Sequence, residues 1–317
     1  MFLKIITNWG WTMYLHKENK ELFRDIISIV SERKNVTTDI VEKDYYVTMI
    51  LRFLSEKMSN IVFKGGTSLS KGYKIINRFS EDIDITFDEH IGEARRKKLK
   101  NCIMREISEK LHMPISNWNE LQSDRDYNAY YFTYKSILGV EGDFMLSYVK
   151  VETALSSYAF PTNKITIGNY IGDYFVKNNR ADLAKKFFVD KFDMKLQAIE
   201  RTYIDKIFAL CDYYIQKKSK RYSRHLYDIY KLTKYIDFDK EFEELYNEIR
   251  EHRKEIKNCV SAKDEVNIPK TIREFCDNDF YKADYQTITS YFLDDYVAYN
   301  NTIKQMKKIA DIIEKYK

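Results

Sequence analysis

One stretch in the first third of the chain constrains the fold more than any other. It begins with Ile61–Lys64, an apolar-rich run of the length and composition of a strand. Gly65 and Gly66 follow directly, and Thr67 and Ser68 then give the signal for the start of a helix. Because glycine has no Cβ, the backbone can approach a ligand closely at this turn, and the start of a helix offers free N–H groups to an anion. The stretch therefore predicts a strand, an anion-binding turn and a helix.

Two aspartates stand one residue apart shortly after this helix. Side chains alternate between the faces of a strand, so Asp82 and Asp84 would share one face while Ile83 and Ile85 face a core. Two neighbouring carboxylates repel each other, and their burial is costly unless a positive charge lies between them. A divalent cation such as Mg²⁺ or Mn²⁺ meets this need, because hard cations bind carboxylate oxygens and keep the phosphates of a substrate as further ligands. The pair predicts a metal site that receives a phosphate-bearing substrate.

The bulk composition is that of a soluble globular protein. The 317 residues suffice for one large domain or two, and 44% of them are hydrophobic and 32% charged. The N-terminal segment lacks the features of a signal peptide, and no apolar run reaches the roughly 18 residues of a membrane span, so we expect no membrane partner. The four cysteines are far apart and form no CxxC pair, which argues against a zinc site or a disulfide framework and favours a reducing cytoplasm.

The first half of the chain mixes helical and strand patterns. Apolar periodicity and capping residues predict helices over 18–33, 39–57 and 92–112. Alternating β-branched and aromatic residues predict strands over 126–136 and 144–153, with a turn between Gly139 and Gly142.

From Gly168 on, the pattern is helical to the end of the chain. We therefore predict an α+β fold, with a small mixed sheet flanked by helices at 1–160 and an α-helical half at 161–317. Between Lys177 and Lys234, 15 Lys and Arg stand against 7 Asp and Glu, so this segment carries +8 while the whole chain carries +5. A basic segment opposite an acidic metal site suits a polyanionic substrate.

The glycine turn matches neither a Walker A loop nor a dinucleotide-binding fingerprint. The order of strand, Gly-Gly-Thr-Ser, helix and Asp-x-Asp instead resembles the nucleotidyltransferase core of the DNA polymerase beta superfamily. The longer string FKGGTSLSKGY…RFSEDIDI resembles the AbiEii/AbiGii toxin family of bacterial abortive-infection and toxin–antitoxin systems. The resemblance extends over about Val41–Leu232 and includes Glu42–Tyr45, which is similar to a segment upstream of the glycine motif in this family. A solvated helix face is the alternative interpretation of that segment.

The resemblance implies three further site residues. Such sites usually carry a third carboxylate on a later strand, and Glu152 is the best match; an edge-strand glutamate paired with Lys150 or solvent is the alternative. The later motifs of the family correspond to Lys206 and Asp228, on two successive predicted helices. Lys206 would neutralise charge on a triphosphate. Asp228 would hold that lysine, bind metal indirectly or act as a base, while a structural salt bridge is the alternative for the pair.

Two polar residues near this site have an open role. Ser80 precedes Asp82 by two residues, so it is either a turn residue or a group that binds phosphate or accepts a nucleotidyl or phosphoryl group. His225 is either a structural histidine or a catalytic one. The predicted nucleotide-binding residues are Gly65, Gly66, Thr67, Ser68, Ser80 and Lys206, and the predicted metal ligands are Asp82, Asp84 and Glu152.

The resemblance implies a metal-dependent nucleotidyltransferase that acts as a toxin in phage defence. It would transfer NMP from NTP to an acceptor such as the 3′ end of tRNA, with release of pyrophosphate, and a cognate antitoxin would be a partner. The residues also allow two alternatives. One is a catalytically idle nucleotide- or RNA-binding module. The other is a nucleotidyltransferase for a small cationic drug of the aminoglycoside type, against which the +8 segment counts.

Overall fold

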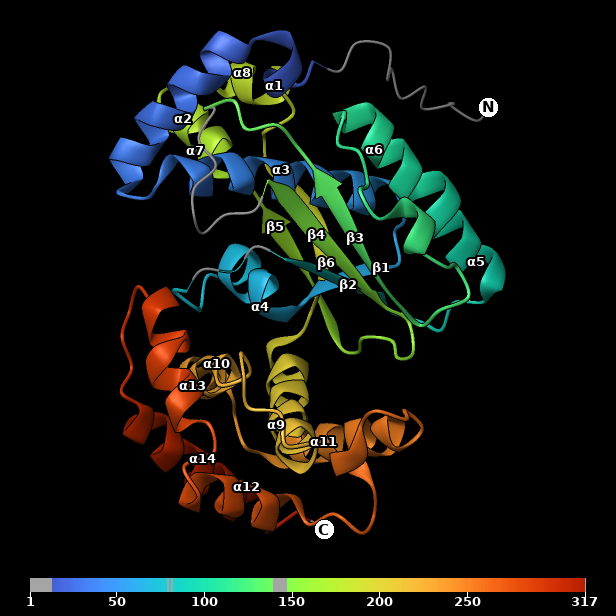
Figure 1. Cartoon of the computed structure of the whole chain (residues 1–317), viewed down its shortest axis with the longest axis vertical. Coiled ribbons are helices and arrows are strands. Elements are labelled where there is room, and N and C mark those ends of the chain that lie inside the picture. The colour runs from blue at the N-terminus through green and yellow to red at the C-terminus, as the bar shows by residue number, and fades with distance from the viewer. Residues whose placement is uncertain (1–12, 79, 81, 139–146, 317) are drawn as a thin grey trace.

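A computed structural model of the chain describes residues 13–78, 80, 82–138 and 147–316. Its centre is a six-stranded mixed sheet in the order β3-β4-β2-β1-β6-β5 (Figure 1). β1 runs antiparallel to β2 and parallel to β6, and β2 runs parallel to β4. The strands are β1 (Ile61–Lys64), β2 (Ile83–Phe87), β3 (Tyr127–Thr133), β4 (Tyr148–Ala154), β5 (Thr162–Ile167) and β6 (Phe192–Gln197).

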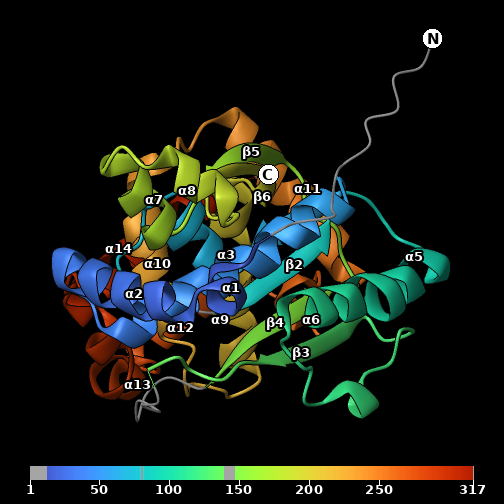
Figure 2. The same cartoon turned by 90° about the horizontal axis from the view of Figure 1, so that it is seen from above.

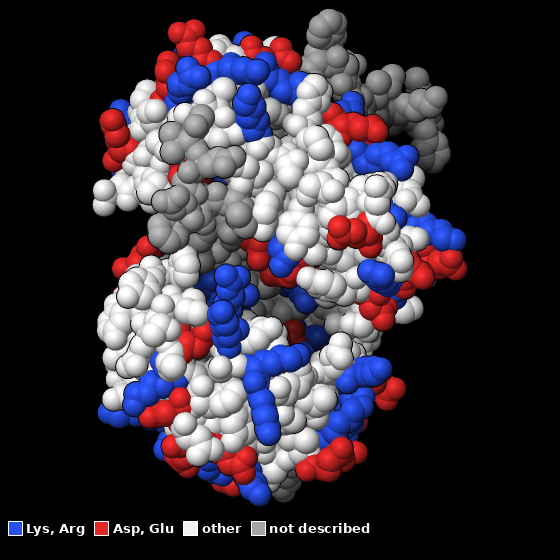
Figure 3. Space-filling model, in the orientation of Figure 1, with Lys and Arg blue, Asp and Glu red and all other residues white. Residues whose placement is uncertain are grey.

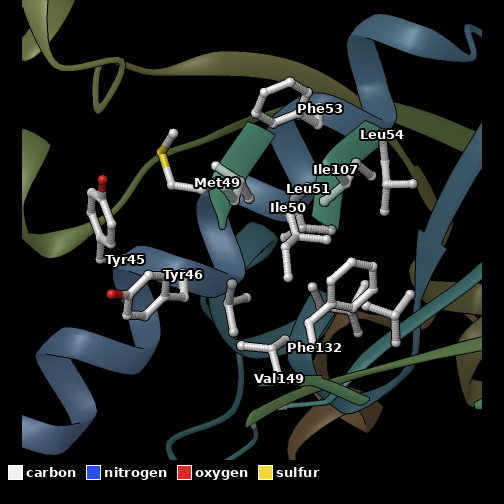
Figure 4. Close-up of a cluster of buried hydrophobic side chains, with 14 of the residues drawn as sticks. Tyr45, Tyr46, Met49, Ile50, Leu51, Phe53, Leu54, Ile107, Phe132 and Val149 are labelled. Atoms are coloured by element: carbon white, nitrogen blue, oxygen red, sulfur yellow. The ribbon is translucent and has the colours of Figure 1, made fainter. Parts of the chain in front are cut away.

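Helices from the first 190 residues cover one face of this sheet (Figure 2). The long helix α3 lies across the sheet and contacts both β4 and β6. Its apolar residues, among them Ile50 and Phe53, pack with Phe132 of β3 and Val149 of β4 in one buried cluster (Figure 4). The helices of this group are α1 (Leu15–Glu18), α2 (Lys20–Lys34), α3 (Thr38–Lys57), α5 (Glu93–Lys98), α6 (Arg105–Leu111), α7 (Tyr170–Lys177) and α8 (Ala181–Lys186).

The C-terminal helices form a second layer on the opposite side of the sheet (Figure 1). They enclose their own hydrophobic cluster, which also takes in Leu69 and Ile76 from the segment after the glycine turn. This segment begins with α4 (Gly65–Thr67) and a π-helical turn over Ser68–Gly72 and continues without regular structure to Ile76, so it joins the sheet to the second layer. The helices are α9 (Ile199–Ile215), α10 (Arg224–Leu232), α11 (Lys240–Lys254), α12 (Ile268–Asp277), α13 (Lys282–Thr287) and α14 (Tyr299–Ile313).

The α+β class is confirmed, but the expectation of helix from Gly168 to the end is wrong at β6. Phe192–Gln197 alternates apolar and polar residues, which is a strand period, and the segment pairs with both β1 and β5. The sheet thus takes two strands from beyond residue 160, while the division of the chain at that residue stays a prediction.

Other sequence-based boundaries shift by a few residues. The helix expected over 92–112 is α5, a π-helical turn and α6 in succession. The predicted strand over 144–153 is seen as β4, and its first residues, the Gly139–Gly142 turn and the N-terminal lead-in lie outside the described residues. In the part of the chain that the structure describes, no helix is both long and apolar enough to cross a membrane.

Candidate active site

Three carboxylates from neighbouring strands line one cavity. Asp84 on β2 lies opposite Glu152 of the parallel strand β4, and Asp82 stands one residue before β2. Ile83 and Ile85 are buried in the core, so the alternation expected from the sequence is confirmed. The cavity has a volume of about 310 Å³ and is lined by all three carboxylates from the sheet and by residues of α9, α10 and α11 from the second layer. Figure 3 shows a hollow between the two layers with basic and acidic side chains in it.

Asp84 is held in an unfavourable environment for a negative charge. Burial raises its pKa to about 7, and the hydrogen-bonded Glu152 carboxyl group adds to the effect. Burial also raises the pKa of Asp82. A cation bound between these two aspartates would stabilise their ionised forms, which agrees with the metal site that the sequence predicts.

Glu152 is engaged by protein groups. Tyr127 Oη donates a hydrogen bond to Glu152 Oε1 at 2.7 Å, and Lys150 forms an ion pair with the same oxygen. The pairing with Lys150 is therefore present, although β4 lies between β3 and β2 and is no edge strand. The described residues contain no ready-made group of three His, Cys, Asp or Glu side chains placed to hold a metal ion. The donor set nevertheless fits a hard divalent cation, because three carboxylates line one cavity and such cations bind carboxylate oxygens.

The glycine turn lets two side chains approach the backbone. Gly65 has φ of +76°, and a Cβ on it would clash with Oδ2 of Asp84. A Cβ on Gly66 would lie 2.5 Å from Nη2 of Arg78 and 3.0 Å from Oγ of Ser80. Both positions therefore need glycine to keep Asp84, Arg78 and Ser80 in place.

The hydroxyls after the turn are used within the protein. Thr67 Oγ1 and Ser80 Oγ are 2.8 Å apart and share a hydrogen bond. Ser68 is fully buried, and its Oγ donates to the carbonyl oxygen of Gly65 at 2.8 Å. Ser80 lines the cavity, whereas Thr67 and Ser68 do not.

A buried aspartate organises the positive side of the cavity. Asp228 is 0% exposed, and Lys206 Nζ donates to its Oδ2 at 2.7 Å. Arg78 binds the same carboxylate with two hydrogen bonds, from Nε to Oδ1 at 2.7 Å and from Nη2 to Oδ2 at 2.8 Å. Burial alone would raise the pKa of Asp228, but the charges of Arg78 and Lys206 outweigh it and hold the pKa far below its usual range. Asp228 is therefore an ionised anchor for two cations, and it does not line the cavity itself.

His225 lines the cavity next to this group. Its Nδ1 lies 3.4 Å from Lys206 Nζ. Burial, together with the nearby charges of Lys206 and Arg224, lowers the pKa of His225 well below its ordinary value, so the ring is neutral at neutral pH. A neutral ring here adds no further positive charge to the cluster.

Sequence reasoning missed Arg78, although it stands two residues before Ser80 within the quoted RFSEDIDI string. The buried Arg78 binds Asp228 of α10, and the carbonyl oxygen of its neighbour Asn77 accepts a hydrogen bond from Tyr227 Oη of the same helix. The signal available was a charged residue inside a short motif rich in acidic groups. Its partner, some 150 residues later, could not be read from spacing.

Acidic and basic side chains line the cavity together. Its cationic lining residues are Lys64, Arg78, Lys206, Arg224 and Arg253, and its acidic ones are Asp82, Asp84, Glu152 and Asp205. Among the described residues Arg224 makes no hydrogen bond or ion pair, so its guanidinium is available to a ligand. Carboxylates facing cations across a cavity suit a phosphate group that arrives with a divalent metal.

The comparison with protein families gives one result. The model for the family described as nucleotidyl transferase AbiEii toxin, type IV TA system, matches residues 50–304. The matched segment includes the glycine turn, the three carboxylates and the cluster around Asp228. Among curated proteins, none matches the chain.

Proposed function

Because the chain belongs to the AbiEii family of nucleotidyl transferase toxins of type IV toxin–antitoxin systems, we propose that it transfers NMP from NTP to the 3′ end of an RNA, with tRNA as the first candidate. The observation that carries this proposal is the cavity, in which three carboxylates face Lys206 and Arg78, both anchored by Asp228. A cognate antitoxin, a role in phage defence and action in the cytoplasm are parts of the same proposal.

Asp82, Asp84 and Glu152 would hold Mg²⁺ or Mn²⁺. When bound, such an ion supplies charge neutralisation for the phosphates and lowers the pKa of a coordinated oxygen nucleophile. It would compete with Lys150 for Glu152, because the two bear the same sign of charge and share one carboxylate.

The chain's own residues would orient and neutralise the triphosphate. Gly65 and Gly66 let the phosphates approach the backbone, and Lys206 and Arg78 offset the negative charge that spreads over them as the bond to pyrophosphate breaks. The acceptor hydroxyl forms a bond to the α-phosphorus and gives up its proton, while pyrophosphate leaves. Asp228 is no candidate for the base, because the structure buries it fully and both its oxygens accept hydrogen bonds from cations.

Incubation with total RNA and each α-³²P-labelled NTP in turn tests the proposal. We expect one NTP to label one RNA size class, with release of pyrophosphate and a requirement for Mg²⁺ or Mn²⁺. Asp82→Ala and Asp84→Ala should reduce labelling by at least about 100-fold. Asp237→Ala, at an exposed site that does not line the cavity, serves as control. Labelling that persists in both site variants would refute the assignment of the carboxylates.

A further inference from the structure

A second, larger cavity lies beside the first. Its volume is about 570 Å³, and its lining includes Thr67, Arg78 and Ser80. Arg78 and Ser80 also line the carboxylate cavity, so the two cavities share a wall at these two residues. A volume of several hundred cubic ångströms accommodates a ligand of nucleotide size.

The larger cavity is basic, and Asp82, Asp84 and Glu152 do not line it. Six cationic residues line it against three aspartates: Lys34, Lys43, Lys71, Lys74, Arg78 and Lys191 against Asp44, Asp173 and Asp294. Three of the cations are paired within the protein: Lys71 with Asp44, Lys191 with Asp173 at 3.2 Å, and Arg78 with Asp228. The Glu42–Tyr45 segment noted in the sequence thus contributes two residues to this cavity, including a lysine that is only 3% exposed.

Two lysines at this cavity keep their charge available. Across the residues that the structure describes, Lys34 and Lys74 make no ion pair or hydrogen bond, and Lys34 contacts only the face of the Tyr170 ring, at 5.4 Å. Lys74 is exposed and has φ of +58°, a conformation in which lysine is disfavoured relative to glycine or asparagine.

A segment with exposed aromatic side chains adjoins the same cavity through Asp294. Tyr291, Phe292 and Tyr296 are 82%, 45% and 66% exposed. Their segment is fixed to the shared wall, because Leu293 forms a β-bridge with Arg78 and the backbone N–H of Asp294, which lines the cavity, donates to the carbonyl oxygen of Asn77 at 3.0 Å.

We propose that the larger cavity, with the aromatic segment at its rim, binds the single-stranded 3′ end of the acceptor RNA; this inference rests on the proposed function and deepens it. Stacking rings beside unpaired lysines are the means by which proteins hold unpaired nucleotides. A triphosphate needs the carboxylates and their metal, whereas RNA phosphates carry one charge each and need only cations. The shared wall then places the terminal hydroxyl beside the cavity where the NTP is held.

Binding of fluorescein-labelled tRNA without NTP tests this inference by fluorescence anisotropy over a range of salt concentrations. Lys34→Ala/Lys74→Ala should weaken binding about tenfold and lower the slope of log K against log salt by about 1.4, since each lost contact with a single strand removes roughly 0.7. Tyr291→Ala/Phe292→Ala/Tyr296→Ala should weaken binding with an unchanged slope, because stacking releases no counterions. Lys304→Ala/Lys308→Ala is the matched control, since both lysines are exposed and α14 lines neither cavity.

Calorimetric titration with each NTP and Mg²⁺ shows whether the larger cavity binds the phosphates of NTP instead of those of RNA. Unchanged NTP affinity in the lysine variant supports the inference, and a loss confined to NTP binding overturns it. Unchanged tRNA binding in both site variants, or no tRNA binding by the wild type, overturns it as well. If the wild type labels RNA but the site variants bind tRNA normally, the inference fails while the function stands. If tRNA binding weakens as expected in a protein that transfers no nucleotide, the RNA site stands and the function fails.

Discussion

Asp84 carries the clearest electrostatic signature among the site residues. Its pKa is raised to about 7 from an ordinary value of 3.8, first by burial and then by Glu152. The unfolded chain therefore releases this proton near pH 4, but the folded, metal-free protein releases it only near pH 7. The contribution of Asp84 to stability is thus complete below pH 4 and is lost as the pH rises through 7.

Asp84→Asn should remove this pH dependence. With a chelator present, we expect the variant to exceed the wild type in unfolding free energy at pH 8 by on the order of 4 kcal/mol, and to match it near pH 4. Added Mg²⁺ should stabilise the wild type at pH 8 and leave the variant unchanged. Urea unfolding checks both points, with Asp237→Asn as control. An unaltered pH profile in Asp84→Asn would show that this carboxyl ionises normally.

Asp228 acts through the two cations that it holds. Asp228→Asn leaves Arg78 and Lys206 buried beside each other without their counter-charge, so we expect a loss of roughly 3–5 kcal/mol of unfolding free energy. The rate of labelling should fall about 100-fold, mainly through weaker binding of the transition state.

The pH profile of labelling shows whether Asp228 only anchors the two cations or acts as the catalytic base. The residual activity of Asp228→Asn should keep the acidic limb of the wild-type profile, because the carboxylate that was removed did not titrate there. Loss of that limb, with an unchanged KM for NTP, would instead identify Asp228 as the base.

At the scale of elements, the glycine turn that follows β1 requires residues without a Cβ at positions 65 and 66. Gly65→Ala adds a Cβ that collides with Asp84 and strains a backbone at φ of +76°, and Gly66→Ala collides with Arg78. We expect each substitution to reduce labelling by about 10- to 100-fold. Gly92→Ala is the matched control, because a Cβ there meets no heavy atom within 4 Å.

The expected difference is in activity more than in stability. Thermal unfolding should show Gly92→Ala near the wild type and the two turn variants lowered by a few degrees at most. If Gly65→Ala labels RNA at the wild-type rate, the turn does not set the position of Asp84.

At the scale of the whole molecule, the order of the strands links the two halves of the chain. β1 carries the lysine before the glycine turn and pairs on one side with β2 and on the other with β6, which comes from residues 192–197. Apart from Leu69, Ile75 and Ile76, which join the second hydrophobic cluster, the cluster residues up to Leu196 belong to the first cluster and those from Tyr203 on to the second.

Truncation tests where the sheet unit ends. A fragment of residues 1–160 lacks β5 and β6 and would expose the edge of β1, so we expect it to aggregate. A fragment of residues 1–198 keeps all six strands and should be the more soluble of the two, as judged by gel filtration and circular dichroism. Equal solubility would support an independent unit that ends at residue 160.

The local sequence determined the strand before Gly65, the glycine turn, and the alternation of Asp82 and Asp84 with the buried Ile83 and Ile85, because each depends on neighbours only a few residues away. The resemblance added the family, which the match over residues 50–304 confirms. The strand at 192–197, the pairing of Arg78 with Asp228 and the second cavity came only from the tertiary structure. Each of these brings together segments separated by more than 100 residues, and the energy of such contacts is not expressed in the local pattern of either partner.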